Sequence, residues 1–355
     1  MQKLNSGFSL VEIMVGLVIG LIGVLVIFQV FTVFEAQKRT TSSGSEAQQS
    51  GMMALYGLDR DVRLAGYGIS NAAALGCTTN AWISGAQQTL PPLAPVSIAT
   101  NANGTNSLSI IYGNSSSGGA PVSFAFPAAD SSANLQIKNQ NGFVINDFII
   151  AYESGLACSL LQITGITPAA APGLPTDLLH ASGGSPHNPP AGSNIFPAGG
   201  YSNNAQLFNL GSLNVITYGI DTVNNRLTQT DVLTNTVAEL ADNIVNLRVQ
   251  YGWDVNNNGT VEQGEYIDAA AFPAPAAAAQ WAQVLSIRVA LLARSNLRER
   301  INAQAAYTCN TTTAVPGPAW AAFVMRNDAD GTLWNCYRYS SYETVIPLRN
   351  IIWMR

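Results

Sequence analysis

The chain opens with a long run of apolar residues. Between positions 8 and 34 the polar side chains are Ser9, Glu12, Gln29 and Thr32. A helix over this range would be about 40 Å long, which is enough to cross the hydrocarbon core of a bilayer. The run is too long for the apolar core of a secretory signal, and no small-residue cleavage site follows it. The pattern predicts a single-pass membrane helix over residues 8–34.

A helical period continues after the membrane segment. Between polar positions such as Asp59 and Asp61, apolar residues recur at a spacing of three to four, at Leu55, Leu58, Val62 and Ala65. This pattern predicts an amphipathic helix over residues 35–68 whose apolar face packs on a globular domain. The small, polar residues 40–45 are a weak point in it, and Gly66 and Gly68 are candidate terminators.

From residue 69 to residue 355 the pattern changes to short β-like runs separated by Gly, Pro, Asn and Ser. The runs with the clearest strand character are residues 108–112, 143–152, 160–164, 213–220 and 227–233. Two Ala/Pro-rich segments, residues 166–204 and 269–282, are predicted to be loops, the second with room for a short helix. The expected fold class is α+β, with the long amino-terminal helix packed on an antiparallel β-sheet domain that carries large loops.

Two further runs alternate between apolar and other residues. In the first run, the residues expected to share one face are Val245, Leu247, Val249, Tyr251 and Trp253. In the second run, they are Leu285, Ile287, Val289 and Leu291, with Ser286, Arg288 and Ala290 opposite. A period of two predicts strands that each have one buried face.

Composition and charge narrow the function classes. The chain has 355 residues, of which 10% are charged, and a formal net charge of −5 with Lys and Arg scattered along it. Since nucleic-acid binding requires a basic face, we expect no nucleic-acid partner. The four cysteines form no C-x-x-C pair, and an even number behind a membrane segment favours disulfides. Four cysteines allow three disulfide pairings, and we favour the one between sequence neighbours, Cys77–Cys158 with Cys309–Cys336. Four free thiols are the alternative.

The sequence contains no recognisable catalytic motif. His180 and His187 are its two histidines, and we expect both to be solvated in the Pro/Gly-rich segment. Phosphate-loop, dinucleotide-binding, zinc-protease and nucleophile-elbow motifs are missing from the sequence. A triad of distant residues would be recognisable only by its geometry. The sequence therefore predicts a protein that is not an enzyme.

One acidic segment, DVNNNGTVEQGE at residues 254–265, fits the twelve-position pattern of a calcium loop. The expected oxygen ligands are Asp254, Asn256, Asn258, the Thr260 backbone, Glu265 and, through water, Glu262. Gly259 would allow the sharp turn. The alternative is an Asn/Gly-rich turn without metal, because the preceding residues alternate like a strand and not like an EF-hand helix. Residues 328–331 lack most of the pattern and are predicted to be a plain turn. Calcium is the one cofactor that the sequence suggests.

The junction before the apolar run explains why an acid stands inside it. Gly7 is followed by Phe8-Ser-Leu-Val-Glu12, which resembles the cleavage site of type IV prepilins. The resemblance implies that a prepilin peptidase removes residues 1–7, that the new amino group of Phe8 is methylated, and that Glu12 neutralises such an amine on an adjacent subunit. A carboxylate at membrane depth is costly without a partner, so this pairing gives Glu12 a physical role. A plain signal anchor is the alternative.

The second half of the chain narrows the resemblance further. Three segments resemble PilW-type minor pilins of the type IV pilus and, more distantly, the J-type minor pseudopilin of type II secretion. They are LADNIVNLRVQYGWD, VLSIRVALLARS and the terminal TVIPLRNIIWMR. Residues 75–205 resemble no family. The resemblance implies a structural protein that helps to initiate pilus assembly at or near the tip. A pseudopilin and a tip adhesin using residues 75–205 are the alternatives.

The resemblance also implies a location and a set of partners. The chain would be held in the bacterial inner membrane by one helix, with its globular domain in the periplasm, and would later lie in a pilus at the cell surface. The expected partners are other minor pilins, the major pilin, the prepilin peptidase, the inner-membrane assembly platform and a tip adhesin.

Overall fold

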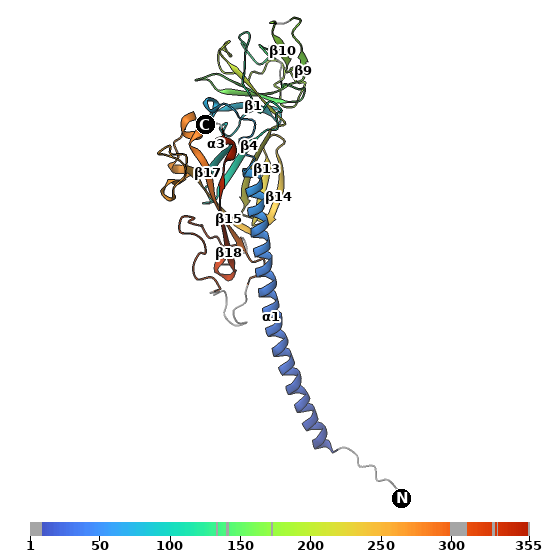
Figure 1. The fold of residues 1–355 in the computed structure, drawn as a ribbon. Helices are drawn as coiled ribbons and strands as arrows, with labels where there is room; N and C mark the ends of the chain where they lie inside the picture. Colours follow the sequence, from blue (N-terminus) through green and yellow to red (C-terminus); the bar gives the residue numbers. More distant parts are fainter. Residues whose placement is uncertain are drawn as a thin grey trace.

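The computed structural model describes residues 9–132, 134–139, 142–171, 173–298, 311–328, 331 and 333–353. A long helix, α1 (Leu10–Val62), carries a globular domain on its second half, and its first half projects from that domain (Figure 1). The helix is continuous through residues 40–45, so the predicted weak point does not interrupt it. The α+β fold expected from the sequence is confirmed.

The first half of α1 has the length and composition of a membrane span. Ser9 caps the helix, since its hydroxyl oxygen accepts a hydrogen bond from the Glu12 backbone N–H at 3.3 Å. Residues Leu10–Glu35 form a segment of 26 residues that is apolar and long enough to cross a membrane, and none of it is buried in the protein. By length and composition, this segment requires an apolar surrounding outside the chain.

The second half of α1 packs on the domain through its small and aliphatic residues. Ala54, Leu58, Val62 and Ala65 are fully buried in the main hydrophobic core. Beyond the helix, Gly66 adopts a positive φ of 82°, and its N–H donates to the Ile111 carbonyl at 2.7 Å. The helix itself ends earlier than the predicted residue 68, at Val62 with Arg63 as its cap, and the left-handed Gly66 turns the chain away just beyond it.

A buried polar contact ties α1 to the sheet below it. Asp61, 4% exposed, accepts a hydrogen bond from the hydroxyl of Tyr218, which is fully buried on β12 (Asn214–Asp221). The Arg60 guanidinium binds the other carboxylate oxygen at 2.8 Å. Burial raises the pKa of Tyr218, and the Asp61 carboxylate raises it further, so the hydroxyl keeps its proton as donor. Asp61 therefore lies on the buried face of the helix, although its charge marked it as one of the polar positions.

Gly51 allows α1 to lie close to the strand β18 (Tyr339–Pro347). A Cβ atom at position 51 would overlap the ring of Tyr342, whereas a Cβ at Gly44, seven residues earlier on the same helix, would meet no atom within 4 Å. The helix α1 and the strand β18 thus come close together at position 51, whereas position 44 faces open space.

We expect Gly51→Ala to lower the unfolding temperature of the chain in mild detergent. Overpacking of a tight contact costs about 1–3 kcal/mol, which outweighs the roughly 1 kcal/mol gained when alanine replaces glycine in a helix. Gly44→Ala is the matched control and should raise the unfolding temperature, because only the helix-propensity gain applies there. Equal shifts for both variants would contradict the close packing of Gly51.

Two sheets form the main core with α1. The five-stranded sheet has the order β14-β13-β12-β4-β3, and the four-stranded sheet has the order β16-β15-β17-β18. The Ile98 N–H of the first sheet donates to the Tyr251 hydroxyl of the second at 2.6 Å. The bounds not yet given are β3 (Val96–Thr100), β4 (Asn106–Tyr112), β13 (Arg226–Asp231), β14 (Thr236–Asp242), β15 (Ile244–Trp253), β16 (Tyr266–Asp268) and β17 (Val284–Arg294).

The two alternating runs are strands, but their faces differ from the prediction. In β15 the register shifts between Ile244 and Asn246, so Val245 packs in a separate small cluster and not with Leu247 in the main core. A bulge of this kind adds one residue and reverses the side-chain alternation before it. In β17 both faces are covered, because Ala290 and Leu292 are buried against Ala321 and Phe323. The prediction of one solvent face was therefore wrong for this strand.

An upper module lies beyond the end of α1 (Figure 1). It has a hydrophobic core of its own, while Ile150 and Phe208 from it pack in the main core. It contains a six-stranded sheet of order β2-β1-β8-β7-β11-β5 and a three-stranded sheet of order β6-β10-β9. Within the described strands, β1 and β8 form the one parallel pair, joined at Thr79↔Cys158 and Asn80↔Ser159. The bounds are β1 (Thr79–Ile83), β2 (Ala86–Thr89), β5 (Val122–Ser123), β6 (Leu135–Ile137), β7 (Phe148–Tyr152), β8 (Cys158–Gln162), β9 (Gly165–Thr167), β10 (Thr176–Leu179) and β11 (Gln206–Gly211).

The segment 166–204 is not the plain loop predicted from its composition. It contributes β10 and most of β9, and Ile195, Phe196 and Tyr201 from it are buried in the upper module. Short helical turns occur elsewhere, including two within residues 269–282, where Trp281 is buried. They are η1 (Ala72–Ala74), η2 (Gln263–Glu265), η3 (Ala269–Ala271), α2 (Ala278–Ala282), η4 (Trp334–Cys336) and α3 (Arg349–Ile352).

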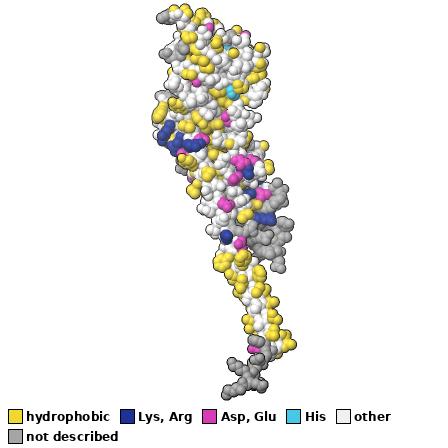
Figure 2. Space-filling model, turned by 90° about the vertical axis from the view of Figure 1, so that its right-hand side faces the viewer, with side chains coloured by type: hydrophobic (Ala, Val, Ile, Leu, Met, Phe, Trp, Pro, Cys, Tyr) yellow, Lys and Arg dark blue, Asp and Glu magenta, His cyan; other side chains and the backbone are white. Residues whose placement is uncertain are grey.

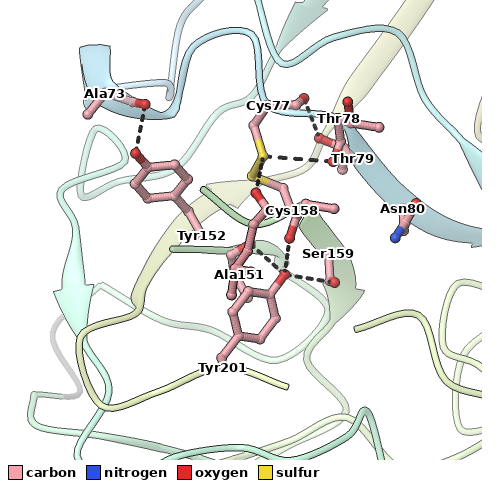
Figure 3. The surroundings of a disulfide bond; sticks show 12 residues. Ala73, Cys77, Thr78, Thr79, Asn80, Ala151, Tyr152, Cys158, Ser159 and Tyr201 are labelled. Atoms are coloured by element: carbon pink, nitrogen blue, oxygen red, sulfur yellow. Dashed lines mark hydrogen bonds between the residues drawn. A yellow bond between two sulfur atoms is a disulfide. The ribbon is translucent and has the colours of Figure 1, made fainter. Parts of the chain in front are cut away.

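A disulfide joins Cys77, just before β1, to Cys158 at the start of β8 (Figure 3). Nearby, the Tyr201 hydroxyl donates to the Ala157 carbonyl at 2.8 Å and lies 2.9 Å from the Ser159 hydroxyl. The disulfide thus fastens the parallel pair of β1 and β8, which shares only two residue positions. Cys336 is also disulfide-bonded, while Cys309, its expected partner, lies outside the described residues.

Candidate functional site

The predicted processing and assembly residues stand at the start of α1. Gly7 and Phe8 lie outside the described residues, and Glu12 is in the first turn of the helix, exposed at the end of the apolar segment. A carboxylate in the first helical turn interacts favourably with the partial positive charge of the helix amino terminus. The structure therefore presents Glu12 outward, where a cationic group of another chain can reach it.

The helix surface around Glu12 is apolar and uncovered. Leu10, Leu17 and Phe34 are each between 65% and 74% exposed, and hydrophobic side chains run along the length of the projecting stem on the face shown in Figure 2. A shallow groove on one side is lined by Ile13, Gly16, Leu17, Gly20, Leu21 and Val24. Added Cβ atoms at Gly16, Gly20 and Gly23 would meet nothing within 4 Å. Such a surface can be covered by lipid or by other apolar helices, and small residues permit close approach of the latter.

Two structural features outside the predicted set position this helix. Gly51 and Asp61 fix the height and rotation of α1 against the domain, so the apolar stem leaves the domain in one direction. Asp61 follows Leu58 by three residues and precedes Val62, so the helical period itself placed it on the buried face. Its charge obscured this signal. Gly51 gave no local signal, because its partner Tyr342 is distant in sequence.

The acidic loop at residues 254–265 is closed by its own hydrogen bonds. Asp254 is fully buried at the end of β15, and its two carboxylate oxygens accept from the Asn258 and Gly259 N–H groups, each at 2.9 Å. The side-chain oxygen of Asn256 accepts from the Asn258 N–H at 2.9 Å, and that of Asn258 accepts from the Thr260 N–H at 2.8 Å. The side-chain oxygens of the first half of the loop thus already point inward.

The carboxylates of the second half of the loop are turned to the backbone. The Glu265 carboxylate accepts from the Glu262 N–H at 2.9 Å, which caps the short helix η2. In the described part of the chain, no three Asp, Glu, His or Cys side chains are gathered so that they could hold a metal ion. For Glu265 to become a ligand, its bond to Glu262 would have to open. Calcium binding at this loop remains a prediction.

We predict that millimolar calcium raises the unfolding temperature of the chain. A ligand that binds only the folded state stabilises it, and the stabilisation grows with the logarithm of the ratio of ligand concentration to dissociation constant. Thermal unfolding with calcium or with chelator measures the shift. Asp254 is buried and structural, so the decisive variant is Glu265→Gln at a half-buried position, which should abolish the shift. An unchanged unfolding temperature in wild type, or a shift that persists in Glu265→Gln, would refute the site.

Both histidines are withdrawn from solvent and lie in the upper module. His180 is 3% exposed, and His187 is half-buried with its ring edge-on to Phe148 at 5.0 Å between centroids. The prediction that both are solvated was therefore wrong, because the segment that carries them folds into the upper module. Burial lowers the pKa of His187, with the Asp231 carboxylate opposing that effect.

Two segments of the chain match known family models. Residues 215–350 match the model of type IV pilus-assembly protein W, and residues 2–28 match the prokaryotic N-terminal methylation motif. No curated protein matches the chain significantly. The first segment runs from β12 to α3, and the second contains Gly7, Phe8, Glu12 and the first turns of α1.

Proposed function

Because this chain is a prepilin-like pilin of the PilW type, by its pilus-assembly segment and its methylation motif, we propose that it is a minor pilin that helps to initiate type IV pilus assembly at or near the pilus tip. The observation that carries the proposal is the uncovered apolar helix with Glu12 in its first turn. Both matched families are structural parts of pili and not enzyme families.

The first step of the proposed mechanism is processing. The prepilin peptidase cuts after Gly7, and Phe8 becomes a methylated, positively charged amino terminus. Glu12 of one subunit then pairs with the amine of an adjacent subunit as the helices leave the bilayer. In an apolar surrounding, an unpaired carboxylate costs several kcal/mol, so the pair fixes the register in which the helices pack.

The second step is placement of the globular domain. Since α1 continues unbroken from the apolar stem into the domain, the domain is carried at a fixed distance from the membrane, on the periplasmic side in this proposal. The upper module extends beyond the end of α1 (Figure 1), in the direction opposite to the stem. A subunit stacked above would meet this module, and a subunit at the tip has nothing above it. The module therefore supports a tip position.

A minor pseudopilin of type II secretion is the competing assignment, because the same stem serves both machines. Co-purification distinguishes them: the major pilin is the expected partner in a pilus, and pseudopilins are expected in a secretion system. An adhesive role of the upper module is an addition to either assignment and not a replacement.

The test of the proposed function is a mass spectrum of the amino-terminal peptide of the membrane-purified chain. We expect a peptide that begins at Phe8 and carries one methyl group. An intact Met1, or a cut beyond the apolar run, would remove the chain from the pilin pathway. The same spectrum from cells lacking the prepilin peptidase is the control and should show the uncut terminus.

A further inference from the structure

The short helix α3 is joined to the carboxyl end of α1. The Asn350 side-chain amide donates to the carbonyls of Leu64 and Ala65, at 3.3 and 2.9 Å. Ile351 of the same turn is 1% exposed and belongs to the main core. Two segments that lie almost 300 residues apart are thereby held side by side.

These two adjoining segments expose large apolar side chains. Trp353 is 80% exposed, and Tyr67, Leu64 and Ile352 are between 44% and 47% exposed. With the exposed Arg349, they form what we call the α1-end patch. Tryptophan is normally well buried, and Trp, Tyr and Arg are the residue types that dominate binding energy in protein interfaces.

The charge around the α1-end patch is positive although the chain as a whole is negative. Arg60 and Arg63 precede the patch on α1, with side chains 63% and 37% exposed, and Arg349 begins α3. The carboxylates that pair with the first two, Asp61 and Asp59, are more buried than the arginines they bind. In Figure 2, Lys and Arg side chains gather at one place at about the height where α1 ends, with hydrophobic side chains beside them. Because Arg60 and Arg63 are each paired with an aspartate, Arg349 carries the net positive charge of this surface, which complements a carboxylate on a partner.

The position of the patch excludes the membrane as its partner. From Glu35 to Val62 the helix rises about 40 Å, while the headgroup layer is roughly 5–8 Å deep on each side of the hydrocarbon core. Nucleic acid is disfavoured, because the guanidiniums of Arg60 and Arg63 are already bound by carboxylates, at 2.8 Å in each case. The exposed aromatic and aliphatic side chains fit an apolar pocket on a protein.

We propose that the α1-end patch docks a second pilin-like subunit, which receives Trp353 in an apolar pocket rimmed by carboxylates that face Arg349. This inference rests on the proposed function and names the surface through which the domain meets its neighbour. The hydrogen bonds from Asn350 hold α3 at the end of α1, so the two subunits would meet near that end.

The experiment uses the full chain in the membrane, co-expressed with the pilin-like subunits of its own filament system. A photo-reactive phenylalanine derivative replaces Trp353, and after illumination the cross-linked partner is identified by mass spectrometry. The same residue at Val223, which is 79% exposed in the turn between β12 and β13, is the matched control. We expect a cross-link to another pilin-like subunit from position 353 and none from position 223. In the Arg349→Glu background, we expect at least a tenfold loss of the product.

Three outcomes would overturn the proposal: no product with a pilin-like subunit, a product with lipid or nucleic acid, or a product unaffected by Arg349→Glu. Arg338→Glu, an exposed charge reversal elsewhere, should leave the cross-link unchanged. Failure of the inference is separable from failure of the proposed function. A chain that is cut and methylated at Phe8 but forms no cross-link retains its function and loses only this docking surface.

Discussion

Glu12→Ala is expected to abolish or strongly reduce piliation while the chain stays in the membrane. Removing one partner of a charge pair in an apolar surrounding costs about 3–5 kcal/mol, which corresponds to a loss of at least about a hundredfold in the packing equilibrium. The membrane anchor is kept, because replacing an acid by alanine makes the segment Leu10–Glu35 more apolar. Electron microscopy counts the pili, and membrane fractionation measures the anchored chain.

Two further variants make this result specific. Glu12→Gln keeps the shape and removes the charge, so it should also lose piliation if charge neutralisation is the role. Glu35→Ala removes the acid at the other end of the span and should leave the number of pili unchanged. Normal piliation in Glu12→Ala, or an equal loss in Glu35→Ala, would contradict a role for Glu12 in helix packing.

The second large effect is expected at Asp61. In Asp61→Ala the buried Tyr218 hydroxyl loses its acceptor and Arg60 loses its partner, so we expect a loss of about 3 kcal/mol in the free energy of unfolding. Thermal unfolding of the detergent-purified chain measures it. The domain should then detach from α1 more readily, which limited proteolysis near the end of α1 would reveal.

The matched control for Asp61 is two residues away on the same helix. Asp59 binds Arg63 at 2.8 Å at the surface, and such exposed pairs contribute less than about 1 kcal/mol. Asp59→Ala should therefore change little. Tyr218→Phe completes a double-mutant cycle with Asp61→Ala, and a coupling energy near zero would show that the buried contact does not hold the helix.

The sequence predicted the features that depend on local pattern. The membrane span, the amphipathic half of α1 and the strands β4, β12 and β17 follow directly from the spacing of apolar residues, because those spacings reflect which face is buried. The turn at Gly66 was predictable from the conformational freedom of glycine. The prepilin motif was predictable because its chemistry lies within six neighbouring residues.

The features that were missed depend on contacts distant in sequence. The bulge that separates Val245 from Leu247 is set by pairing with β17, and the cover over Leu292 comes from residues 311–328. The burial of His180 depends on β9 and β10, whose short strands are hidden in a Pro/Gly-rich composition. The α1-end patch could not be predicted, since it forms only when the last turn of the chain reaches the end of α1.

One strand pairing in the five-stranded sheet joins two parts of the chain that are distant in sequence. Strands β4 and β12 are adjacent, with Tyr112 opposite Asn214, although the chain between them travels through most of the upper module. The segment that leaves β4 and the segment that returns to β12 lie close together at Gly113, where the Leu210 carbonyl leaves no room for a Cβ atom. The chain between these two strands builds β5 to β11, while β1 and β2 of the same module precede β3, and the family match begins at residue 215, just after the chain returns to the five-stranded sheet. Changes at outward-facing positions of the module should therefore leave α1 and the five-stranded sheet intact, whereas changes at Ile150 or Phe208, which pack in the main core, should be felt by both.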